Sequence, residues 1–262
     1  METLLVFLLT GAVSGLLAGL FGVGGGLIVV PALAFLLPTL GTADAIVMQS
    51  AIGTSLAVIG LTGISSTRAH HARGGVIWPV FWKLAPGIVV GSLLGATVAH
   101  LVSSEVLKRC VGIGAMLIAI QMLIDATPKA TRSTPGALGL GIVGTLIGGL
   151  SALIGIGGGS LTVPYLNACN IDMRRAVGTS AACGIPIAWA GAVGFVINGL
   201  GVPGRAPWSL GYVDMAAFAG IAVMSVFTAP LGARLAHGLS PKVLKRAFAI
   251  FLIGISVRML LA

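Results

Sequence analysis

The shortage of charged side chains constrains this chain more than any other feature. Its 262 residues include 15 Lys or Arg and 6 Asp or Glu, so charged residues make up 8% of the sequence. Soluble domains carry about 25% charged residues. With 57% hydrophobic residues, this chain cannot cover a water-soluble globule with polar groups. The composition therefore indicates a membrane protein, and it excludes a cytosolic enzyme and a disordered chain.

The formal net charge of +9 has a different meaning in a membrane protein than in a soluble one. On a soluble domain it would suggest contacts with nucleic-acid phosphates, whereas in a membrane protein Lys and Arg indicate which loops stay in the cytoplasm. We therefore expect the lipid bilayer as a partner and no nucleic acid. The three cysteines form no Cys-x-x-Cys pair, and no Walker A lysine, His-Glu-x-x-His or Gly-x-Ser-x-Gly motif occurs. We expect no metal, no cofactor and no enzymatic activity.

Long apolar runs predict an all-α membrane protein. A spanning helix needs about 20 mostly apolar residues. The runs that are bounded by charges, Gly or Pro cover residues 4–37, 45–65, 76–100, 106–124, 138–166, 175–198, 211–237 and 243–261. The first run lacks the basic residues that precede a signal peptide, so we expect it to be retained.

Two motifs occur once in each half of the chain. Glycines 22, 24, 25 and 26, followed by Pro31, recur at a shift of 133 as glycines 155, 157, 158 and 159, followed by Pro164. Gly53-Thr54-Ser55 recurs as Gly178-Thr179-Ser180. Each half thus holds four hydrophobic segments in the same order. We expect a first transmembrane repeat over 1–127, a linker over 128–135 and a second repeat over 136–262.

The first segment of each repeat is too long for one crossing and is broken by its glycines. It is either a discontinuous helix that crosses or a re-entrant hairpin that returns to its starting side. If all eight segments cross, the 15 Lys and Arg divide 7 to 8 between the two sides of the membrane. If both first segments are hairpins, they divide 11 to 4. Since a cytoplasmic face carries an excess of Lys and Arg, we favour hairpins, inverted repeats and both termini outside.

The duplicated glycine breaks are the predicted binding site for an anion. A helix interrupted in the bilayer leaves backbone N–H groups free, and these groups attract anions at a helix N-terminus. Two breaks related by a pseudo-two-fold axis would meet near the membrane midplane, where secondary transporters bind substrate. The predicted substrate-binding residues are Gly24, Gly25, Gly26, Thr54, Ser55, Gly157, Gly158, Gly159, Thr179 and Ser180.

Structural roles are the alternatives for these residues. The glycines could serve close helix packing, as we expect for Gly87 with Gly91 and for Gly144 with Gly148. The hydroxyls could bond to carbonyls of their own helix. All six Asp and Glu residues lie at segment ends or in loops. Because intramembrane acids are typical of proton relays and cation sites, a cation pump is disfavoured.

The run from Gly19 to Pro31, its second copy over 152–164 and the Gly-Thr-Ser motif resemble the signature of the sulfite exporter TauE/SafE family of bacterial inner-membrane proteins. The resemblance covers nearly the whole chain. It implies transport, mostly export, of sulfur-containing anions such as sulfite and organosulfonates.

The residues and the resemblance together predict a secondary transporter, acting as an exporter, for a small sulfur-containing anion. An anion channel of the same architecture and a non-transporting assembly or sensor protein are the alternatives. The expected partners are the anionic substrate and the lipid bilayer, and a homodimer is left open. The expected location is the bacterial inner membrane.

Overall fold

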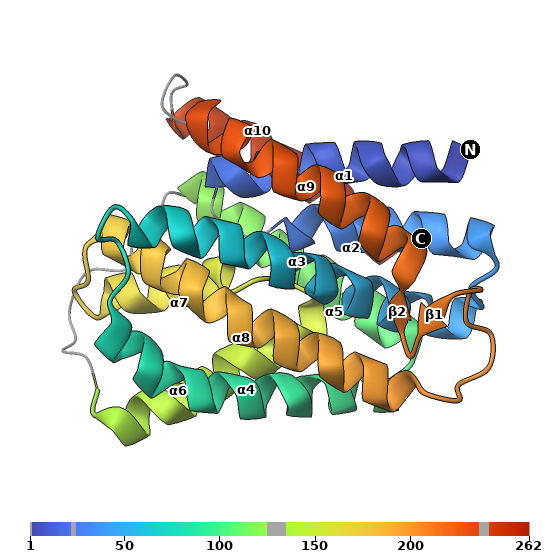
Figure 1. Ribbon diagram of the computed structural model, residues 1–262, viewed down its shortest axis with the longest axis horizontal. Helices are drawn as coiled ribbons and strands as arrows, with labels where there is room; N and C mark the ends of the chain where they lie inside the picture. The colour runs from blue at the N-terminus through green and yellow to red at the C-terminus, as the bar shows by residue number, and fades with distance from the viewer. Residues whose placement is uncertain (1, 22–24, 125–134, 236–240, 262) are drawn as a thin grey trace.

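The computed structural model describes residues 2–21, 25–124, 135–235 and 241–261. It is built almost entirely from helices, as Figure 1 shows, and this confirms the predicted all-α class. In the first half the helices are α1 (Glu2–Phe21), α2 (Gly26–Leu36), α3 (Val47–His71), α4 (Trp78–Leu101) and α5 (Ser104–Ile124). In the second half they are α6 (Ala137–Ile154), α7 (Gly159–Ala168), α8 (Met173–Gly199), α9 (Met215–Leu235) and α10 (Pro241–Leu261).

Short elements connect these helices at two places. The 3-10 turns η1 (Leu37–Leu40) and η2 (Asp44–Ile46) lead from α2 to α3. Between α8 and α9, the two-residue strands β1 (Ser209–Leu210) and β2 (Val213–Asp214) form a hairpin, in which Ser209 pairs with Asp214.

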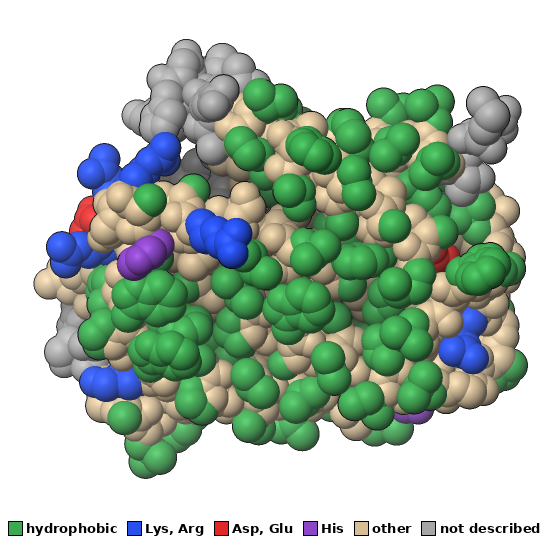
Figure 2. Space-filling model, in the orientation of Figure 1, with side chains coloured by type: hydrophobic (Ala, Val, Ile, Leu, Met, Phe, Trp, Pro, Cys, Tyr) green, Lys and Arg blue, Asp and Glu red, His purple; other side chains and the backbone are tan. Residues whose placement is uncertain are grey.

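Six helices in the described part of the chain are long and apolar enough to cross a membrane: α3, α4, α5, α6, α8 and α9. The first predicted segment divides into α1 and α2, and the fifth divides into α6 and α7. Figure 2 shows hydrophobic side chains over most of the visible face, as expected for a surface in contact with lipid. The chain is therefore a multi-pass membrane protein.

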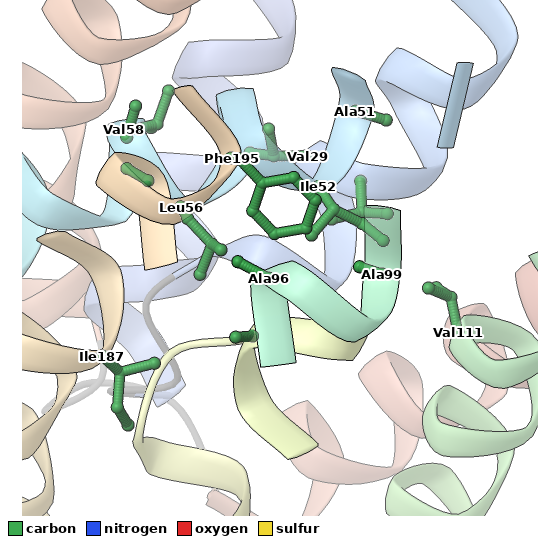
Figure 3. Packing of buried hydrophobic residues seen from close by; sticks show 14 of the residues in the cluster. Val29, Ala51, Ile52, Leu56, Val58, Ala96, Ala99, Val111, Ile187 and Phe195 are labelled. Atoms are coloured by element: carbon green, nitrogen blue, oxygen red, sulfur yellow. The ribbon is translucent and has the colours of Figure 1, made fainter. Parts of the chain in front are cut away.

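Helices of the two halves pack against each other rather than forming separate bundles. α1 lies along α9, α6 lies along α4, and α5 lies along α10, while α3 contacts α8 at the centre. Most of the α3 surface is buried inside the protein. Val29, Ile52, Ala96 and Phe195 belong to one buried cluster, drawn in Figure 3.

Glycines allow the α4–α6 pair to approach at backbone distance. A Cβ atom on Gly87 would overlap the carbonyl of Gly141, and one on Gly91 would overlap the carbonyl of Thr145. Gly144 and Gly148 pack in the same way on carbonyls of α4. These contacts confirm the packing role predicted for the four glycines on α4 and α6.

Contacts among the loops and helix ends distinguish the two ends of the molecule. At one end, Gly75, after α3, packs on Gly178 of α8. At the other end, the backbone N–H of Ala43 donates to the carbonyl of Gly204 at 2.8 Å, and that of Met48 donates to Ser104 Oγ at 3.1 Å. In Figure 1, α1 begins at this second end, and α2 returns toward it. α6 begins at the first end, and α7 returns there.

Candidate functional site

The break between α1 and α2 ends on a glycine with a left-handed backbone. Gly25 precedes the first residue of α2 and has φ of 78°, a conformation that costs little only for glycine. No side chain of the described residues caps the start of α2. Gly25 and Gly26 are buried, whereas the predicted site residue Gly24 lies outside the described residues.

The break between α6 and α7 is described in full and lies in the protein interior. α6 ends at Ile154, Gly155 turns the chain with φ of 73°, and α7 begins at Gly159. The backbone N–H groups of Gly155 and Ile156 donate to the carbonyl of Ser151. No described side chain caps the start of α7. The buried turn therefore presents a helix N-terminus with uncapped N–H groups.

The start of α2 packs directly on the break between α6 and α7. A Cβ atom on Gly26 would overlap the carbonyl oxygen of Gly155, and one on Gly155 would lie 2.6 Å from Val30 Cγ2. Ser55 Oγ donates to the same Gly155 carbonyl at 3.1 Å. The start of α2 is thus in direct contact with the break in the other half of the chain.

Thr54 and Thr179 have equivalent structural bonds that the sequence did not predict. The N–H of Asp214, just before α9, donates to Thr54 Oγ1 at 2.9 Å. The N–H of Ile77, just before α4, donates to Thr179 Oγ1, also at 2.9 Å. Each threonine therefore fixes the start of a helix in the opposite half of the chain. Each hydroxyl proton stays available as a donor.

Ser55 and Ser180 differ, although they occupy equivalent positions in the two motifs. The Ser55 hydroxyl is bonded to Gly155, whereas Ser180 Oγ is buried and has no hydrogen-bond partner among the described residues. A Cβ atom on Gly158 would lie 2.8 Å from the Ser180 carbonyl oxygen. The turn before α7 therefore packs on α8 at Ser180.

Three further hydroxyls in this region escaped the sequence prediction. Ser151 in the last turn of α6, and Ser160 and Thr162 in α7, are buried and have no partner within the described part of the chain. The sequence feature that could have identified Ser160 is its position directly after the second glycine run, because the residue at the same position after the first run is Leu27. Buried hydroxyls normally have partners, so a group of unpaired ones is a candidate for ligand binding.

Asp214 lies outside the spanning helices, as predicted for the acidic residues, but it is buried. It lies in the hairpin before α9, and its side chain is 4% exposed. Its Oδ1 accepts from the N–H of Ala217 at 2.8 Å, which caps the start of α9. Among the described side chains it is the one buried charged group. The unpaired hydroxyls of Ser151, Ser160, Thr162 and Ser180 are, by contrast, neutral hydrogen-bond donors.

Comparisons with known proteins identify the family of this chain. Residues 7–259 match the family model described as sulfite exporter TauE/SafE. A protein of Haemophilus influenzae named "probable membrane transporter protein" is 37% identical over 259 residues, covering 98% of both chains. A protein of Methanocaldococcus jannaschii with the same description is 30% identical, covering 92% of this chain and 89% of its own length. No solved structure matches the chain.

Proposed function

This chain belongs to the sulfite exporter TauE/SafE family, and from that premise we propose that it is a secondary transporter. Its substrate is a small sulfur-containing anion such as sulfite or an organosulfonate, which it exports across the bacterial inner membrane. The observation that carries the proposal is the buried, uncapped start of α7 beside buried hydroxyls that have no partner among the described residues.

Helix geometry explains why this region suits an anion. The first N–H groups of a helix have no partner in their own helix, and the helix dipole adds partial positive charge there. In the proposed site the glycine backbone of 157–159 faces the substrate, with the hydroxyls of Thr179 and Ser180 as additional donors. Since neutral donors bind an anion less tightly than a buried Lys or Arg would, the anion can also leave.

The second part of the proposal is that residues 1–127 and 136–262 are inverted repeats. Three features support it: the duplicated motifs, the exchanged pairs α1–α9 and α4–α6, and the equivalent bonds of Thr54 and Thr179. Each repeat then begins with a re-entrant hairpin, α1–α2 or α6–α7. Movement of these hairpins against the remaining helices gives alternating access to the site.

Tags at the two ends of the chain test the inverted topology. The end of the molecule that contains Arg68, Arg73 and Arg174 is expected to face the cytoplasm, because it carries the Lys and Arg excess. An impermeant reagent added outside intact spheroplasts should therefore label a cysteine-containing tag at either terminus. A cytoplasmic tag that reacts only after lysis serves as the control. Labelling of one terminus alone would contradict the inverted repeat.

Flux into proteoliposomes tests the transport activity itself. Uptake of radiolabelled sulfite or sulfoacetate is expected to saturate with concentration, and the same anion is expected to raise the melting temperature of the purified protein. Binding at about 100 times Kd adds about 2.7 kcal/mol to the free energy of unfolding. Flux that does not saturate and reaches channel rates would identify a channel. Absence of both flux and stabilisation would favour an assembly or sensor protein.

A further inference from the structure

We infer that the two glycine breaks are not equivalent, and that the anion is bound by the second one through Ser160, Ser180 and the first backbone N–H groups of α7. Ser160 thereby becomes a binding residue, and the start of α2 becomes a packing element. The inference rests on the proposed function and specifies which half of the chain contacts the substrate.

The first step of the argument is the backbone at the start of α7. The first backbone hydrogen bond of α7 is donated by the N–H of Thr162 to the carbonyl of Gly158, at 2.9 Å. The N–H groups of Gly159, Ser160 and Leu161 precede that bond and have no partner within the helix. Since no described side chain caps this terminus, these three donors need a partner from elsewhere.

The second step is the pair of hydroxyls at the same place. Ser180 is fully buried and Ser160 is 8% exposed, and neither has a partner among the described residues. The packing of Gly158 on the Ser180 carbonyl places this part of α8 against the start of α7. An unpaired buried hydroxyl destabilises the folded protein, and an anion that accepts from both serines would remove that penalty.

The orientation of Ser180 follows from its counterpart in the first half. Ser55 Oγ lies 3.2 Å from the position that a Cβ atom would take on Gly26, the first residue of α2. Gly159 is the residue of α7 that corresponds to Gly26, and Ser180 corresponds to Ser55. A serine at this motif position therefore directs its hydroxyl toward the start of the broken helix.

The third step is that the start of α2 lacks free side-chain donors. The residue that corresponds to Ser160 is Leu27, which packs with Ile156 and Phe248 in a buried hydrophobic cluster. Ser55 uses its hydroxyl on the carbonyl of Gly155. Gly26 is covered by that same carbonyl, which would repel an anion. Unpaired hydroxyl donors are thus present at the start of α7 and absent among the described residues at the start of α2.

The donors at α7 define the class of ligand. They are neutral O–H and N–H groups, which match the several acceptor oxygens of a small oxyanion or of a sulfonate headgroup. The buried carboxylate of Asp214 bonds to the start of α9 and so is not a component of this site.

Three alanine variants test the inference, with sulfite and sulfoacetate as separate probes. Ser160→Ala and Ser180→Ala are each expected to raise the anion concentration for half-maximal thermal stabilisation about tenfold, since each removes a bond to a charged ligand. The same shift is expected in the half-saturating concentration for flux. Without anion, both variants should melt at or above the wild-type temperature, because each removes an unpaired hydroxyl.

Ser55→Ala is the matched control from the first half. It loses the bond to Gly155, so it should melt at a lower temperature without anion but should require less than about twofold more anion for half-maximal stabilisation. The reverse pattern, with Ser55→Ala weakening anion binding and the α7 variants unchanged, would overturn the asymmetry while leaving the proposed transport function intact. A wild-type protein that neither probe stabilises, and that transports neither, would overturn the proposed function and this inference together.

Discussion

Replacing Gly158 with valine is expected to reduce saturable anion flux by more than about tenfold while the protein still inserts in the membrane. A Cβ atom at this position would lie 2.8 Å from the Ser180 carbonyl oxygen and 3.0 Å from the backbone nitrogen of Gly184. Both are backbone atoms that cannot rotate away, so the turn before α7 has to move off α8. Overpacking of this kind costs about 1–3 kcal/mol, and a cost of about 2 kcal/mol corresponds to a loss of about 30-fold in the binding-competent arrangement.

The measurement is flux per inserted protein in proteoliposomes, normalised to the amount that is monodisperse in detergent. Gly254→Val is the control, because a Cβ atom on Gly254 would have no described neighbour within 4 Å apart from the backbone of its own helix. Gly25→Val is a second test, since φ of 78° at Gly25 disfavours any side chain, above all a β-branched one. Wild-type flux in correctly inserted Gly158→Val and Gly25→Val would show that the breaks do not form the site.

A Gly87→Ala/Gly91→Ala double variant is expected to lose about 3 kcal/mol or more of unfolding free energy. Each added Cβ atom would overlap a carbonyl of α6, at Gly141 or at Thr145, so the two helices would have to separate along their whole contact. Close approach through small residues provides the attraction between helices in lipid, where burial of apolar surface contributes little. Thermal unfolding in a fixed detergent and lipid mixture measures the loss.

The matched control for this variant is Gly141→Ala/Gly254→Ala. Gly141 lies in the same helix pair, yet a Cβ atom on it would have no described neighbour within 4 Å. Since alanine favours a helix by about 1 kcal/mol over glycine, the control should melt at or above the wild-type temperature. If both double variants lose the same stability, glycine content rather than helix contact is responsible.

Much of the fold could be predicted from the sequence because membrane spans depend on length and hydrophobicity. The apolar runs correspond to the observed helices, and the second glycine run marks the observed end of α6 and start of α7. The packing role of Gly87, Gly91, Gly144 and Gly148 followed from their spacing of four residues. These properties are local, so no knowledge of distant contacts was needed.

The candidate site was predicted less completely, because the partner of a hydroxyl cannot be identified from its own position. Thr54 bonds to Asp214, 160 residues away, and Ser55 bonds to Gly155, 100 residues away. The prediction from sequence assigned Ser55 and Ser180 the same role and did not include Ser160. Only the packed structure shows which hydroxyls have partners.

By itself, the sequence determined that this chain is a multi-pass membrane protein, and it predicted two related halves with a glycine run in the first segment of each. These conclusions follow from composition and repetition, because hydrophobicity and the backbone freedom of glycine are properties of individual residues. Only the tertiary structure decided how the halves pack against each other and which serines near the breaks have no partner. The physical reason is that hydrogen bonds and backbone contacts form between segments far apart in the sequence. Two copies of one motif can therefore have different partners even when their residues are the same.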